Sequence, residues 1–125
     1  MKLKAPATAP SPGGSANGSS ESTSALKQRD AETRSVVAVL KKAFPRATVD
    51  AYRYATWSIR VRVIDPAFGK IKPFDRIDKV SDALDALPSS TQQQIIRVVP
   101  VTPAEHRKKV WSHDYEFDHP LPIKA

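Results

Sequence analysis

Residues 47–64 read ATVDAYRY-AT-WSIRVRVI, and this stretch decides the fold. In Trp57–Ile64 apolar residues alternate with serine and arginine, which is the period-two pattern of a strand with one face on a core. Ala47–Tyr54 reads as a preceding strand, and the short link at Ala55–Thr56 predicts an antiparallel hairpin. Trp57 is expected on the core side of its strand.

Helices are predicted on both sides of this hairpin in the sequence. Upstream, apolar residues recur at helical spacing from Leu26 to Phe44. Pro45 ends that helix, because the residue before a proline is pushed out of the α region. Downstream, a loop runs from Asp65 to Pro73, and a second helix is predicted over Phe74–Leu87. Proline suits the first turn of a helix, so Pro73 marks its start.

The C-terminal third adds one more strand and one more helix. Gln94–Val101 reads as a strand, in which Pro100 favours an edge position or a strand end. Thr102–Glu105 has the pattern of a capping box, with proline at the first helical position, and opens a short helix through Trp111. Residues 112–125 carry two further prolines and are predicted to be extended.

The predicted order is helix, strand, strand, helix, strand, helix. It indicates an α+β two-layer domain over residues 26–111, with a three-stranded mixed sheet and helices on one face. Because the third strand follows a helix, it is expected to run parallel to a hairpin strand after a right-handed crossover. Residues 1–25 are rich in Ser, Ala, Pro and Gly and are predicted to be a disordered tail.

Charge and cysteine content narrow the class of protein. The chain has 20 Lys and Arg against 13 Asp and Glu, a net charge of +7, and nearly all the excess lies after the predicted tail. A basic folded surface is compatible with nucleic acid or another acidic partner. The absence of Cys excludes disulfides, thiolate metal sites and thiol catalysis, and with no signal or transmembrane pattern it favours a cytoplasmic location.

Several short motifs together resemble the BolA family, whose fold is akin to the class II KH domain. The resemblance covers roughly residues 26–110 and implies a small binding module of that fold. In the family a Phe and a nearby Gly precede a signature helix, and Arg76 and Val80 stand at the family's spacing after Phe68. The motifs that carry the resemblance are Lys41–Pro45, Ala47–Val49, Val61–Asp65, Pro66–Lys70 and Thr102–Glu105.

The chain also departs from that family at its best-known functional positions. The family's signature histidine, an iron–sulfur ligand shared with a monothiol glutaredoxin, is replaced by Ile77, and Asp78 replaces the following arginine. The family's other metal ligand comes from the loop between the first two strands. Here that loop, Tyr54–Thr56, is too short and contains no Cys or His. The KH signature Gly-x-x-Gly is missing because Gly69 stands alone. We therefore expect no cofactor, no metal and no cluster-sharing role.

Two groups of basic residues are candidates for nucleic-acid binding. Arg60 and Arg62 share one face of their strand, Arg97 is expected to line up with them, and tyrosines lie nearby. Arginine beside tyrosine can contact phosphates and stack on bases. The alternative is an ordinary solvated sheet face, where arginine stems cover apolar surface. The second group frames the loop before the second helix and consists of Lys70, Lys72 and Arg76.

The second basic group predicts a phosphate site at a helix N-terminus, formed by Lys70, Lys72 and Arg76, although Asp75 and Asp78 reduce its positive charge. Other clusters have simpler explanations. The segment 113–119 holds two histidines six apart, which matches no zinc spacing. In this segment charged residues alternate with Tyr115 and Phe117, which predicts that the two rings lie against the domain. The basic run 106–109 fits a solvated helix end.

No nucleophile elbow or phosphate-cradling glycine loop is present, so no catalytic residue is assigned and an enzyme is not expected. Phe68 and Phe74 are expected to anchor the loop between them to the core. The sequence thus predicts a non-enzymatic binding module that contacts DNA or RNA through a basic sheet face and loop. The alternative is a protein–protein adaptor that keeps the BolA-like partner surface without its metal chemistry.

Overall fold

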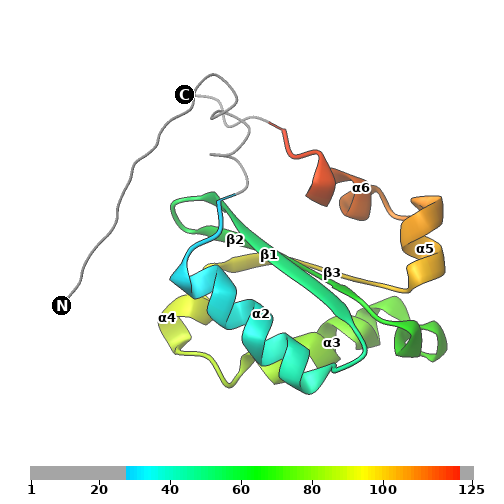
Figure 1. Ribbon diagram of the computed structural model, residues 1–125, viewed down its shortest axis with the longest axis horizontal. Coiled ribbons are helices and arrows are strands. Elements are labelled where there is room, and N and C mark those ends of the chain that lie inside the picture. Colours follow the sequence, from blue (N-terminus) through cyan, green and yellow to red (C-terminus); the bar gives the residue numbers. More distant parts are fainter. Residues whose placement is uncertain (1–27, 122–125) are drawn as a thin grey trace.

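A computed structural model describes residues 28–121 of the chain (Figure 1). The predicted disordered tail, residues 1–25, lies outside the described residues. The rest forms an α+β domain around one three-stranded mixed sheet, as predicted from the sequence. In the described part of the chain, no helix has the length and apolar character needed to cross a membrane.

The sheet has the strand order β1-β2-β3. β1 (Thr48–Ala55) and β2 (Ser58–Ile64) form the predicted antiparallel hairpin. β3 (Ile95–Val101) pairs parallel to β2, as the intervening helix required, and lies at the edge of the sheet. Both predictions for this strand are confirmed, and its edge position explains how it accommodates Pro100.

Two helices lie together on one side of the sheet, α2 (Ala31–Ala43) and α3 (Pro73–Leu84) (Figure 1). α2 begins later than the predicted Leu26, because Asp30 and Thr33 form a capping box that fixes its first turn. The main core lies between these helices and the sheet. Its fully buried side chains include Val36, Leu40, Ile59, Val61, Val63, Phe68 and Val80.

Short helical segments occupy parts of the predicted loops. A 3-10 helix, η1 (Pro66–Lys70), follows β2 and is capped by the Asp65 side chain, which accepts from the amide of Ala67 at 2.9 Å. α4 (Ser89–Gln92) precedes β3. α3 ends at Leu84 rather than the predicted Leu87, although the Leu87 side chain is still buried in the core.

The C-terminal segment differs from its prediction. α5 (Pro103–Lys108) opens on the predicted capping box, but Ser112–Asp118 forms a helix, α6, instead of an extended segment. Its helical turn places Asp114 and Asp118 on the same side, where both bind Arg62. α6 packs on the sheet face opposite α2 and α3 (Figure 1). An alternating pattern is a weak guide in a segment this short.

Predictions for the large aromatic residues are partly wrong. Phe68 is buried as expected and meets the Phe44 ring at 5.7 Å, so it anchors η1 to the end of α2. Trp57, however, is 74% exposed, because it lies in the hairpin turn beyond the core. Phe74 is 85% exposed, since α3 buries the stripe through Val80 and Leu84 and turns Phe74 away from it.

Candidate nucleic-acid interface

The arginines of β2 and β3 lie next to one another, as the sequence predicted. Arg60 is the register partner of Arg97, and Arg62 follows two residues along β2. Tyr52 of β1 is the register partner of Arg60 on the other side. A basic and aromatic sheet face is therefore present, but α6 lies over it.

α6 holds Arg62 with two carboxylates. Arg62 Nη1 lies 3.2 Å from Asp114 Oδ1 and 2.8 Å from Asp118 Oδ2. Asp114 is fully buried, and the Arg62 guanidinium also stacks on the Phe117 ring at 4.4 Å. Since a buried charge is costly unless it is paired, Asp114 depends on Arg62 and on His106, whose Nδ1 lies 3.0 Å from Asp114 Oδ2.

The other two sheet arginines differ in the partners of their guanidinium groups. Arg97 forms an ion pair with Glu116 of α6. Arg60 is only 8% exposed and stacks on the Tyr54 ring at 3.7 Å, yet its Nε and Nη1 atoms are buried with no hydrogen-bond partner. Burial of such donors without acceptors costs roughly 1–3 kcal/mol. Arg60 thus keeps two donors without an acceptor and has no carboxylate partner among the described residues, while its guanidinium also interacts with the Tyr52 hydroxyl.

Phe117 anchors α6 to the sheet. Its ring lies 4.7 Å from that of Tyr52, and Tyr52 Oη donates a hydrogen bond to the Phe117 carbonyl at 2.7 Å. Burial raises the pKa of the Tyr52 hydroxyl. Beyond α6, Tyr54 Oη donates to the carbonyl of Leu121. The sequence left two possibilities for this sheet face, an exposed ligand-binding surface or an ordinary solvated one. The face is neither, because α6 covers it.

The sequence did carry a signal for this cover. Residues 114–118 contain three carboxylates in five positions, and they complement the charges of Arg62 and Arg97. Matching the acidic segment to the basic strands would have suggested an internal contact. The fold supplies what the sequence lacks, namely the path that returns the chain over the sheet after β3.

Arg76 lies inside the structure rather than on the surface. It is 4% exposed and donates to the Ile71 carbonyl at 2.8 Å, to the Pro100 carbonyl at 3.3 Å and to Glu105 Oε1 at 2.7 Å. The hydrogen bond from Arg76 to Glu105 lowers the pKa of the Glu105 carboxyl. Arg76 thereby joins the start of α3 to β3 and α5.

Lys70 and Lys72, by contrast, are exposed: Lys70 is the last residue of η1, and Lys72 is the N-cap residue of α3. Neither forms an ion pair with a described residue. The loop is fixed from two sides: Phe68 contacts the end of α2, and a Cβ built on Gly69 would lie 3.8 Å from Thr102 at the start of α5. The two lysines therefore lie between α2 and α5.

Further exposed cations belong to segments that meet this end of the sheet, where β2 and β3 finish and β1 begins: the last turn of α2, the turn before β1, and α5 (Figure 1). We call this group the basic end. None of its members forms an ion pair with another described residue. The basic end consists of Lys41, Lys42, Arg46, Lys70, Lys72, Arg107 and Lys108.

Exposed carboxylates without an ion pair lie mainly along α3. Asp75 is in its first turn and reduces the positive potential beside Lys72, as expected. Asp78 and Asp82 follow on the exposed side of the helix, and Asp85 lies just after it. The described surface is thus divided between a basic end and an acidic helix.

Two cavities lie beside β3 and are lined in part by α3. The larger, about 340 Å³, is mostly apolar and includes the exposed side chains of Phe74 and Ile77. Pro100 and Trp111 complete its apolar wall, with His113 beside them. Burial is the main cause of a lowered His113 pKa.

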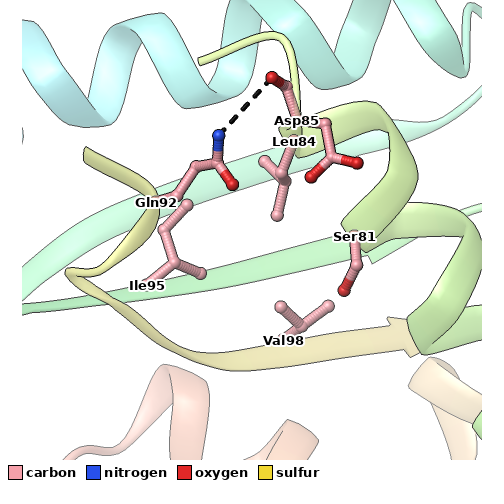
Figure 2. Close-up of a pocket in the computed structure, with 6 residues that line it drawn as sticks. All are labelled: Ser81, Leu84, Asp85, Gln92, Ile95 and Val98. Atoms are coloured by element: carbon pink, nitrogen blue, oxygen red, sulfur yellow. Dashed lines mark hydrogen bonds between the residues drawn. The ribbon is translucent and has the colours of Figure 1, made fainter. Parts of the chain in front are cut away.

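The smaller cavity, about 140 Å³, lies between α3, α4 and β3 (Figure 2). Figure 2 shows Gln92 reaching across it to the Asp85 carbonyl, at 3.4 Å. Its other lining groups, such as Ser81 and Leu84, contain no nucleophile paired with a base. This cavity presents no chemistry beyond a polar rim.

One group of metal-competent side chains occurs in the described chain, and two of its three members lie in the segment 113–119 considered above. His106, Asp114 and Asp118 offer ligand atoms within 4.8 Å of one another. The same two carboxylates, however, bind Arg62, and Lys109 lies 3.6 Å from Asp118. Cations of the protein already neutralise these oxygens, so the group is an ion-pair network.

Comparison with protein-family models finds no match for this chain, and comparison with curated proteins finds no significant match.

Proposed function

We propose that this chain is a small, non-enzymatic nucleic-acid-binding module that contacts phosphate groups through its basic end. The observation that supports the proposal most is the number of exposed, unpaired cations, Lys70 and Lys72 among them, on the described segments that meet one end of the sheet. The BolA-like resemblance adds to it, since that fold is akin to an RNA-binding domain. Of the residues nominated from the sequence, these two lysines remain available to a ligand.

The arrangement suits a polyanion better than a small anion. The cations come from α2, the η1–α3 loop and α5, and so they lie along one end of the sheet instead of converging on one point. Spread positive charge of this kind attracts a phosphate backbone and releases its counterions on binding. Binding should therefore be weakly dependent on sequence and strongly dependent on salt.

The test is a titration of a fluorescent single-stranded oligonucleotide, followed by anisotropy at 50 and 200 mM salt. The wild-type chain should bind more weakly at the higher salt, with a logarithmic slope of roughly 0.7–0.9 for each phosphate contact. A K70S/K72S variant should bind more weakly at both concentrations, and its slope should be smaller.

An R34S/K79S variant is the matched control. Arg34 and Lys79 are exposed, form no ion pair with a described residue and lie outside the basic end. The control loses the same charge as K70S/K72S but should retain most of the affinity. Equal losses in the two variants, or no binding by wild type at 50 mM salt, would show that the proposal is wrong.

A second candidate function, the protein–protein adaptor, is favoured by the apolar cavity beside β3. Phe74 and Ile77 are exposed there, and Ile77 stands where the BolA-like resemblance has its signature histidine. A pull-down from nuclease-treated lysate with wild type and F74S tests it, with I96S as the control because Ile96 is also exposed but lies outside the cavity. An adaptor should lose the same captured protein in F74S alone.

A further inference from the structure

We propose that α6 is a detachable acidic cover over a second nucleic-acid surface, formed by Arg60, Arg62 and Arg97 with the neighbouring tyrosines. The inference rests on the proposed function, and it adds to it a regulation: the covered surface becomes available only when α6 leaves the sheet. The expected ligand is single-stranded nucleic acid.

The first argument is the chemical match between the cover and a phosphate backbone. Carboxylates of α6 occupy the positions in front of two sheet arginines: Asp114 and Asp118 bind Arg62, and Glu116 binds Arg97. Phosphate oxygens make the same charge-assisted hydrogen bonds with guanidinium groups. A nucleic-acid strand could therefore replace α6 without leaving these arginines unpaired.

The second argument is that α6 provides no carboxylate partner for Arg60. Arg60 lies between its partners Tyr52 and Arg97 in the sheet, and its Nε and Nη1 have no acceptor although they are buried. The cover thus pairs with the outer arginines and leaves the central one without an anion. A ligand with an additional acceptor would satisfy a group that the closed structure leaves unsatisfied.

The third argument is the aromatic component of the face. Tyr52 and Tyr54 lie on the same side of β1 as the arginines, and Arg60 stacks on the Tyr54 ring. Tyrosine rings beside cations suit the binding of single-stranded nucleic acid. Unpaired bases stack on aromatic side chains, and the phosphates form ion pairs with the cations. Bases stacked in a duplex cannot use such rings, so single strands are favoured.

The cover itself is small. α6 has seven residues, and a helix of that length is not stable in water without tertiary contacts. Its fully buried apolar anchor is Phe117, with the hydrogen bond from Tyr52 beside it. The main core, between the sheet and α2 and α3, contains no residue of α6. Opening can therefore leave the rest of the domain folded.

The experiment compares two ways of weakening the cover. A D114N/E116Q/D118N variant removes its charges, and F117A removes its anchor without changing the net charge. If closed molecules predominate, the apparent affinity of the covered face is reduced by the fraction of open molecules. Each variant should then bind a single-stranded oligonucleotide tighter than wild type does, by roughly tenfold or more.

Each variant has a matched control on α3. D78N/D82N/D85N makes the same change in charge at exposed carboxylates without ion pairs, along α3 and at its end, and leaves Asp75 beside Lys72 in place; F74A removes an exposed ring. Circular dichroism establishes that every variant is folded. Adding R60Q to F117A should cancel the gain, because Arg60 belongs to the covered surface. A duplex of the same length should show a smaller gain than the single strand.

Tryptophan fluorescence reports on displacement of the cover in an otherwise intact chain. W57F leaves Trp111 as the remaining tryptophan, at the start of α6 and packed on the Tyr52–Phe117 cluster. Saturating oligonucleotide should shift the Trp111 emission to longer wavelength as α6 leaves the sheet. The inference is overturned if folded F117A and the charge variant bind no tighter than their controls, or if Trp111 emission is unchanged when they bind.

The same data separate this inference from the proposed function. If wild type binds through Lys70 and Lys72 but the cover variants gain nothing, the basic end stands and the cover is wrong. If wild type does not bind and the cover variants do, the basic end is wrong and the covered surface stands.

Discussion

Arg76 and Glu105 join the start of α3 to the capping box of α5. Arg76 Nη1 lies 2.7 Å from Glu105 Oε1, and the same Glu105 oxygen accepts from the amide of Thr102 at 3.0 Å. One carboxylate thus both caps a helix and neutralises a buried arginine. Because Arg76 also donates to two backbone carbonyls, this pair fixes the loop that carries Lys70 and Lys72.

Replacing Arg76 by alanine should destabilise the domain strongly. Removal of one partner leaves Glu105 and two carbonyls without their donor, and breaking a buried ion pair costs about 3–5 kcal/mol. Urea unfolding at pH 7 measures the loss. The exposed R107A is the control and should change the free energy of unfolding by less than about 0.5 kcal/mol. A similarly small change in R76A would mean that Arg76 is not a structural residue.

The lowered pKa of Glu105 predicts acid sensitivity. Arg76 favours the ionised form in the folded state, so the pair contributes its full stability above the ordinary pKa of 4.5 and loses it as pH falls from there through the lowered folded value. The free energy of unfolding should decrease over that range. E105Q, which retains a side chain suited to the capping box, should be less stable at pH 7 and should lose less between pH 5 and pH 3.

An E116Q variant checks that this pH dependence belongs to Glu105. Glu116 is also paired with an arginine, but at a more exposed site on α6. If E105Q and E116Q flatten the decrease equally, the effect reflects overall charge and not the Arg76 contact.

Phe68 of η1 and Phe74 of α3 provide a direct comparison of two phenylalanines that flank the same short link. The sequence predicts both as anchors, but Phe68 is buried in the core and Phe74 is almost fully exposed. F68A should lower the free energy of unfolding by about 3–5 kcal/mol, as for other buried phenylalanines. F74A should change it by less than about 0.5 kcal/mol. Equal effects in denaturant unfolding would contradict the orientation of α3 described here.

These residues also show which part of the structure the sequence determines. The hairpin and the parallel third strand follow from local alternation and from proline and capping signals, because these depend on neighbours in the chain. Whether Phe74 faces the core or the solvent depends on the orientation of α3 about its own axis relative to the sheet. A phenylalanine at the edge of an apolar stripe is compatible with either side, so its sequence position does not decide its burial.

The candidate site was harder to predict for the same reason. Lys70 and Lys72 could be assigned to an exposed loop from the sequence alone, since flexible, strongly hydrated cations in a loop remain at the surface. Arg62 and Arg76 could not be distinguished from them. Their partners, Asp114 and Glu105, are 52 and 29 residues away, and only the folded path of the chain brings the charges together.

The hydrogen bond between Tyr52 and Phe117 provides the last prediction, which concerns the stability of α6 alone. Y52F removes a hydroxyl that donates to the Phe117 carbonyl and leaves the aromatic contact, so it should weaken the attachment of α6 by about 1 kcal/mol. Native-state hydrogen exchange measures this locally. Amides of α6 should exchange about fivefold faster in Y52F, while amides at the centre of β2 should exchange through larger openings that change less. Y115F is the control, because Tyr115 is exposed on α6. Equal acceleration in α6 and β2 would mean that α6 opens only with the whole domain, and a detachable cover would then be excluded.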